Sequence, residues 1–101
     1  MSKAAPSEQH LRFVLWGAAP KVVHVGVEYV AADGSPAAGA DLGFAVGAAP
    51  RIVSHDPKLP DGSYRLRIDV QTRDIRKLTE RQVTLAGATV SVDLVDLLDP
   101  K

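Results

Sequence analysis

One stretch, residues 59–70, constrains the fold more than any other part of the chain. It opens with the turn residues Pro60, Asp61 and Gly62 and continues as a run in which every second residue is apolar. The apolar residues are Tyr64, Leu66, Ile68 and Val70, with Arg65, Arg67 and Asp69 between them. Because successive side chains of a strand point to opposite faces, this alternation predicts a strand with one buried and one exposed face. We expect it to be the central strand of a β-sandwich.

Six further segments have strand-like patterns, and turn residues separate them. In chain order, the seven expected strands cover residues 10–16, 21–31, 38–46, 51–56, 63–71, 76–85 and 88–95. The third is rich in glycine and alanine and the fourth ends before Pro57, so both are expected at sheet edges. Seven short strands at this spacing predict an all-β fold, a β-sandwich or small barrel.

Residues 72–80 admit two interpretations. Ile75 and Leu78 stand three apart, a spacing that is compatible with about two helical turns. Alternatively, a strand over residues 76–85 contains a β-bulge, which would explain why Leu78 is out of phase with Val83. We favour the bulged strand, because it continues the succession of hairpins.

The length of the chain, 101 residues, suits a single domain. We expect this domain to span residues 10–96, after a flexible leader at residues 1–9 and before a fraying tail at residues 97–101. The leader lacks the hydrophobic segment of a signal peptide. Two locations are therefore considered: the cytoplasm, if Met1 is the authentic start, or the periplasm or a lipoprotein whose native signal has been removed. We favour the exported location.

The charge balance argues against two classes of partner. Twelve basic and twelve acidic side chains give a formal net charge of zero. The chain therefore lacks the excess of basic residues that attracts nucleic acid or anionic membranes. No apolar run reaches the length of a transmembrane segment. A chain without net charge is also weakly protected against association. We therefore expect the partner to be another protein or a second copy of the chain, while the identity of any small ligand stays unknown.

Two motifs carry a family resemblance. The first is Asp-Gly-x-Pro-x-x-Gly-Ala, which begins at Asp33, and the second is Leu-Pro-Asp-Gly-Ser-Tyr-Arg-Leu at residues 59–66. Both are similar to motifs of carboxypeptidase regulatory-like domains, and the likeness extends over roughly residues 21–95. The resemblance implies a seven-stranded antiparallel Greek-key β-sandwich of transthyretin-like type. Such domains are accessory modules, so the resemblance transfers no catalytic residue. Residues 47–56 depart from the family pattern, which keeps immunoglobulin-like and fibronectin-type sandwiches as alternatives.

Tyr64 of the second motif has a further expected role. Its ring supplies an apolar body, and its hydroxyl can hold a neighbouring loop, as in the tyrosine corner of related sandwiches.

Residue types that support catalysis or metal binding are present, but their spacing does not bring them together. His10, His24 and His55 lie far apart and lack a ligand spacing such as His-Glu-x-x-His. Ser54, His55 and Asp56 contain the residue types of a catalytic triad, yet consecutive strand residues point to opposite faces. The absence of cysteine excludes a thiol nucleophile. We expect no catalytic, metal-binding or cofactor-binding residues, and therefore no cofactor and no enzyme.

The candidate interaction site is an apolar patch on two neighbouring strands. Val14 and Trp16 share the nominally outward face of the first expected strand, and Val22 and Val30 that of the second. If the two strands pair, these side chains form an exposed patch of the kind that marks interaction sites. The alternative is that an extra strand or the leader covers them.

These observations predict a non-catalytic β-sandwich module for protein–protein interaction or structural support, at a bacterial cell envelope. The alternative function is binding of a small ligand or carbohydrate. It ranks lower because aromatic residues make up only 5% of the chain, and sugar binding needs a stacking platform. An enzyme ranks last.

Overall fold

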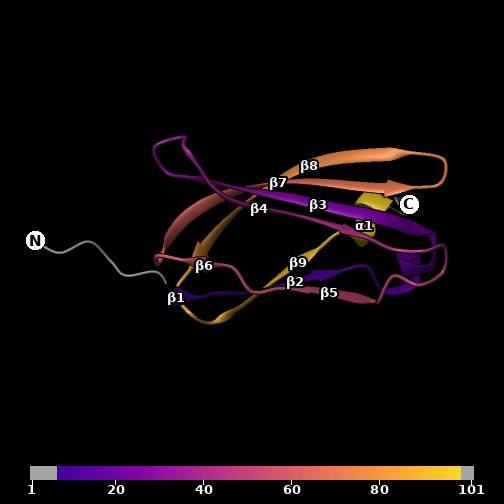
Figure 1. Cartoon of the computed structure of the whole chain (residues 1–101), viewed down its shortest axis with the longest axis horizontal. Helices are drawn as coiled ribbons and strands as arrows, with labels where there is room; N and C mark the ends of the chain where they lie inside the picture. Colours follow the sequence, from indigo (N-terminus) through magenta and orange to yellow (C-terminus); the bar gives the residue numbers. More distant parts are fainter. Residues whose placement is uncertain (1–6, 99–101) are drawn as a thin grey trace, which may run out of the picture.

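The structure, a computed structural model that describes residues 7–98, is organised around β7 (Gly62–Thr72). This strand lies inside a four-stranded antiparallel sheet in the order β4-β3-β7-β8 (Figure 1). Its neighbours are β3 (Val22–Ala31) and β8 (Arg76–Leu85), and β4 (Pro36–Gly43) forms the far edge beyond β3. The alternate residues Tyr64, Leu66, Ile68 and Val70 are all buried. The predicted central strand is therefore confirmed.

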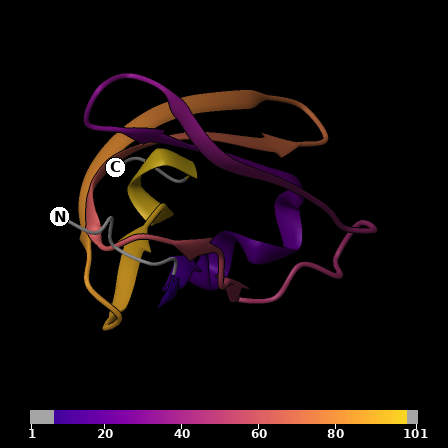
Figure 2. The same ribbon diagram turned by 60° about the vertical axis from the view of Figure 1, so that its left-hand side comes forward.

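A second layer faces this sheet (Figures 1 and 2). It contains a three-stranded sheet in the order β5-β2-β9 and a two-stranded sheet that pairs β1 with β6. These strands are β1 (Ser7–Glu8), β2 (His10–Val14), β5 (Ile52–His55), β6 (Lys58–Leu59) and β9 (Thr89–Asp93). Two short helices complete the fold: the 3-10 helix η1 (Trp16–Lys21) and α1 (Val95–Leu98).

The hydrophobic core fills the space between the two layers. Its largest completely buried apolar side chains are Leu11, Phe13, Leu15, Tyr29, Leu66, Ile68, Leu85 and Leu94. Burial of a leucine, isoleucine or phenylalanine side chain stabilises the folded state by about 1.5–3 kcal/mol, so this set contributes much of the driving force for folding. The alternation of β7 places four side chains in this core and leaves its arginines in solvent.

The all-β prediction is confirmed, but the strand count and the pairing differ from the expectation of seven antiparallel strands. The described residues form nine strands in three sheets. Gln9 separates β1 from β2, and Asp56 with Pro57 separates β6 from β5, where proline lacks the backbone N–H that a ladder needs. The pairing of β2 with β9 is parallel, so the expected antiparallel arrangement is wrong at this position.

The expected leader and tail also differ from the structure. Residues 1–6 and 99–101 lie outside the described part of the chain. Within it, β1 pairs with β6, and Gln9 is completely buried, so residues 7–9 belong to the fold. At the other end, the expected last strand stops at Asp93, and α1 follows with Leu98 buried.

Two of the expected strands have different boundaries in the structure. The first expected strand stops at Val14, and η1 replaces the expected turn at residues 17–20. The third expected strand begins two residues earlier than predicted and ends at Gly43. The expected edge positions of this strand (β4) and of β5 are confirmed.

The strand interpretation of the ambiguous segment is confirmed, whereas the bulge is wrong. β8 spans Arg76–Leu85 and pairs with β7 without a register shift over these residues. Leu78 is out of phase because it points outward, and its side chain is 68% exposed. The hairpin closes through a hydrogen bond in which Thr72 N–H donates to the Ile75 carbonyl at 2.8 Å.

The expected role of Tyr64 is confirmed. Its hydroxyl donates to the Pro60 carbonyl at 2.6 Å and so holds the turn that precedes β7. Across residues 7–98, no helix combines the length and the apolar character needed to cross a membrane.

Candidate functional site

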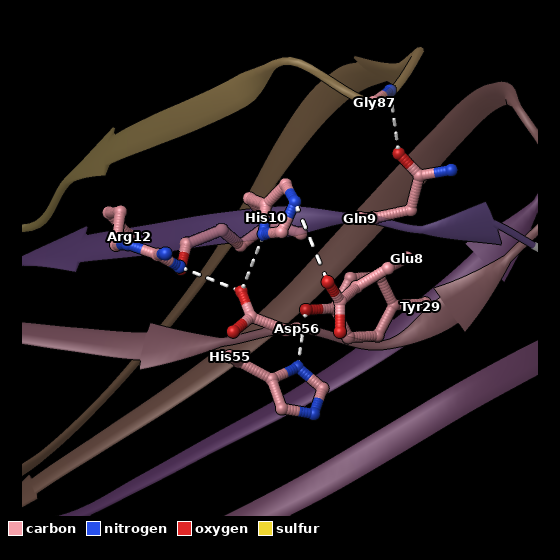
Figure 3. A network of polar contacts seen from close by, with 9 residues as sticks. Glu8, Gln9, His10, Arg12, Tyr29, His55, Asp56 and Gly87 are labelled. Carbon is pink, nitrogen blue, oxygen red and sulfur yellow. Dashed lines mark hydrogen bonds and ion pairs between the residues drawn. The ribbon is translucent and has the colours of Figure 1, made fainter.

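A network of polar side chains follows β2 and the end of β5 (Figure 3). Arg12 Nη1 donates to Asp56 Oδ1 at 2.9 Å, and His10 Nδ1 lies 3.2 Å from the same oxygen. His10 Nε2 in turn lies 3.9 Å from Glu8 Oε1. The hydrogen bonds from Arg12 and His10 hold the pKa of Asp56 below its usual value. These groups lie on the outer surface of the layer, where screening by solvent weakens each pair.

His55 precedes Asp56 but points the other way, into the sandwich. Its Nδ1 lies 2.7 Å from the hydroxyl of Tyr29, a completely buried residue of β3 (Figure 3). Burial raises the pKa of Tyr29 and lowers the pKa of His55, although the nearby Asp56 carboxylate partly opposes the latter shift. Both groups are therefore neutral near pH 7. The contact is a single hydrogen bond that joins the two layers rather than an ion pair.

The three residues with catalytic-triad types diverge as expected. Ser54 is exposed and lies opposite Arg12 in the ladder, whereas His55 faces Tyr29. Among the residues that the structure describes, no group of three or more His, Asp or Glu side chains is arranged to hold a metal ion.

Gln9 lies between Glu8 and His10, and its buried side chain joins this part of the chain to two distant segments. Its Nε2 donates to the Leu59 carbonyl at 2.8 Å and to Asp61 Oδ1 at 3.0 Å. Its Oε1 accepts from the Gly87 N–H at 3.0 Å (Figure 3). Gln9 falls within the expected leader, and nothing local in the sequence signals this role, because its partners lie about fifty and eighty residues away along the chain.

The outer face of the four-stranded sheet is hollowed, with a volume of about 1000 Å³. The residues that line it come from β3, β4, β7 and β8, and include Gly26 and Gly39 together with four carboxylates. These carboxylates belong to Glu28, Asp41, Asp69 and Glu80. Arg67 is the single basic residue in this lining. The hollow is therefore open, and the charged residues that line it are mainly acidic.

Two buried polar atoms lie beside this hollow. His24 Nε2 lies 3.2 Å from Asp41 Oδ1, and Arg76 donates to Asp69 Oδ2 at 2.9 Å through Nε. The hydrogen bond from Arg76 holds the pKa of Asp69 below its usual value. Within residues 7–98, His24 Nδ1 and Asp69 Oδ1 are buried without a hydrogen-bond partner.

Four connecting segments meet at one end of the sandwich, on the right in Figure 1. The strand registers place them there, since Val14 pairs with Ile52 and Asp93, and Val22 pairs with Thr72. The segments are η1, residues 44–51, residues 73–75 and α1. We call this the η1 end.

Exposed apolar side chains concentrate toward the η1 end. The exposed large hydrophobic residues of the described chain are Trp16, Val46, Ile52, Ile75 and Leu78. The first four lie in these connecting segments or directly beside them, and Leu78 is the third residue of β8. The turns at the opposite end, residues 32–35, 60–61 and 86–88, contribute none of this set. Such a concentration is typical of an interaction surface.

Trp16 occupies an unusual backbone conformation at this end. Its φ of 44° is positive, which is the case for no other non-glycine residue in the described range. The carbonyl of Arg51 accepts from the N–H groups of both Leu15 and Trp16, at 2.8 and 3.1 Å. Leu15 is completely buried, while Trp16 remains 49% exposed. The left-handed turn therefore keeps a large aromatic side chain at the surface, at a cost of about 1–3 kcal/mol.

The predicted four-residue patch does not form. Trp16 is exposed, but Val14, Val22 and Val30 are buried. Val22 joins the core because the β3–β7 register shifts between Val22 and His24, which turns Val22 inward. Val14 and Val30 are flanked by neighbours on both sides in their sheets. The other exposed apolar residues lie outside the predicted patch, although Ile75 and Leu78 stand out of phase with the alternation.

No protein-family model, no curated protein and no solved structure matches this chain significantly.

Proposed function

We propose that this protein is a non-catalytic β-sandwich module that binds another protein through its η1 end. The observation that carries the proposal is the exposed Trp16 side chain, held by a left-handed backbone among further exposed apolar residues. Tryptophan is enriched among the few residues that dominate binding energy in protein interfaces. Strained backbone is a feature of ligand-binding and switch regions, where the surrounding structure maintains it.

The proposal includes a relationship to transthyretin-like, seven-stranded Greek-key sandwiches of the carboxypeptidase regulatory-like type. The connection order supports it: the chain alternates between layers, with β3, β4 in one, β5 in the other, then β7, β8 and finally β9. Counting β1 with β2 and β5 with β6 gives seven strands. The first motif acts as a turn, since Ser35 N–H donates to Asp33 Oδ1 at 2.9 Å and Gly34 has a φ of 89°. Tyr64 supplies the tyrosine corner.

The test is a comparison of Trp16→Ala with a matched surface variant, Ser91→Ala, on β9. Proteins captured from a lysate by the unmodified chain are purified, and their affinity for each form is measured by calorimetry. Truncation of an aromatic anchor costs about 2 kcal/mol or more, so Trp16→Ala should weaken binding at least roughly 30-fold. Ser91→Ala should bind like the unmodified chain. Equal affinity of all three forms would contradict the proposal.

A second candidate function is binding of a small cationic ligand in the hollow of the four-stranded sheet. It is favoured by the lining of the hollow, in which four carboxylates stand with a single basic residue, Arg67. Titration with spermidine, followed by the amide NMR signals of Gly26 and Gly39, tests it. Saturable shifts that Asp41→Asn removes would support this function, and unchanged signals would exclude spermidine-like ligands.

A further inference from the structure

We infer that β4 pairs with the β4 of a second copy of this chain, so that two four-stranded sheets join into one continuous sheet. β4 is the edge strand of its sheet and pairs only with β3 among the described strands. An edge strand presents a row of unpaired N–H and C=O groups, which can accept another strand. This surface differs from the η1 end, so the inference stands independently of the proposed partner site.

The ladder between β3 and β4 shows which backbone groups are free. Phe44 N–H donates to the Val23 carbonyl at 2.9 Å, just beyond the pair His24 and Gly43. Hydrogen-bonded and non-hydrogen-bonded pairs alternate in an antiparallel ladder. The residues Gly39, Asp41 and Gly43 therefore occupy non-hydrogen-bonded positions relative to β3. Their backbone N–H and C=O groups point to the open edge.

A second β4 can satisfy these groups in a two-fold, antiparallel register centred on Ala40. In this register Gly39 pairs with Asp41 of the second copy, and Asp41 pairs with its Gly39. Centring on Asp41 would instead place two like charges directly opposite each other, which is destabilising. Centring on Leu42 would leave little of β4 in the overlap, because the strand ends at Gly43. The register about Ala40 avoids that repulsion and keeps Pro36, which has no backbone N–H, outside the overlap of residues 37–43.

The side chains of β4 fit the same register. On the inner face, Ala38 would lie opposite Leu42 of the second copy, and Ala40 opposite Ala40. These three residues are only partly buried where they pack against the core, so a neighbouring strand would cover them further. On the outer face, Asp41 is drawn back over β3: a Cβ atom added at Gly26 would lie 3.0 Å from its Oδ1. The carboxylate therefore does not obstruct the edge.

Two of the other sheet edges, those of β8 and β5, carry features that discourage pairing. β8 has charged residues on both faces, with Lys77 and Arg81 alternating with Arg76 and Glu80. β5 has four residues and lies between Pro50 and Pro57. Short edge strands, prolines and charges pointing inward are established protections of sheet edges. β4 has eight residues, a single charged side chain, Asp41, and one proline, at its first position.

The chain contains no cysteine, which permits a direct test by disulfide formation. In the proposed register Ala40 faces its own copy in a non-hydrogen-bonded pair, where Cα atoms are about 4.5 Å apart. This separation lies within the range of disulfides. Under mild oxidation, Ala40→Cys should form covalent dimers at least about ten times faster than Ser91→Cys, an exposed control on β9. Equal rates would overturn the register.

Two measurements on the unmodified chain complete the test. Sedimentation should show a dimer of the 10.7 kDa chain that forms with rising concentration and persists in Trp16→Ala. Hydrogen exchange of the Gly39 and Asp41 amides should slow as the dimer forms, whereas the Leu78 amide on the β8 edge should not change. A monomer at millimolar concentration, or protection confined to other segments, would overturn the inference.

Discussion

Replacement of Gln9 by leucine should destabilise the fold strongly, because a completely buried side chain loses three hydrogen bonds. Each such bond contributes about 0.5–1.5 kcal/mol net, and buried partners left without a bond add to the loss. For three hydrogen bonds the expected loss in the free energy of unfolding is about 3 kcal/mol. This is a large fraction of the 5–15 kcal/mol that is typical of a domain.

The assay is urea unfolding followed by circular dichroism, together with a thermal melt. For a domain of this size, a loss of about 3 kcal/mol lowers Tm by about 12–24 °C. Glu8→Ala, one residue earlier on the exposed strand β1, is the control and should change stability by less than about 0.5 kcal/mol. If Gln9→Leu is as stable as the control, then Gln9 does not hold the segments around Leu59 and Gly87 together.

Three further predictions address other contacts. Tyr64→Phe removes the hydrogen bond to the Pro60 carbonyl and should cost about 1 kcal/mol in urea unfolding, with the β-sheet spectrum unchanged. Because the pKa of His55 is lowered in the folded state, the unfolded chain takes up a proton first as pH falls below about 6.5, so acid should destabilise the protein between pH 7.5 and 5.5. His55→Gln should lose less stability over that interval, and an identical loss would refute the role of burial. Gly34→Ala should cost about 1 kcal/mol because Gly34 has a φ of 89°, and an unchanged melting temperature would contradict that strain.

The parts of the fold that the sequence predicted are those whose pattern is local. The alternation of apolar and polar residues predicted that Tyr64 and Leu66 are buried and located β7 and β8. It could do so because the polarity of each strand residue indicates whether its face is buried or exposed. Turn residues located the hairpins, and the composition of β4 indicated an edge. These signals need no knowledge of distant segments.

The features that were missed depend on contacts between distant segments or on irregular backbone. β1 exists because residues 7–8 meet residues 58–59. Gln9 is held by two distant segments, residues 59–61 and Gly87. Val22 points inward because the register shifts between Val22 and His24, and simple alternation along a strand does not predict such a shift. For the candidate site, Trp16 was named correctly as exposed, but its three expected companions are buried. Its actual neighbours at the η1 end come from connections that the topology brings together.

The parallel pairing of β2 with β9 links the beginning of the fold to its end. β2 occupies residues 10–14, and its partner strand occupies residues 89–93. At about 5–20 residues per second, a ribosome needs several seconds between the synthesis of these two strands. During that interval β3, β4, β7 and β8 can assemble, while Leu11 and Phe13 lack one of the neighbours that flank them in the finished sheet. Nascent chains of this protein therefore complete their second layer only after β9 has been synthesised, and until then the apolar residues of β2 are open to chaperones and to aggregation.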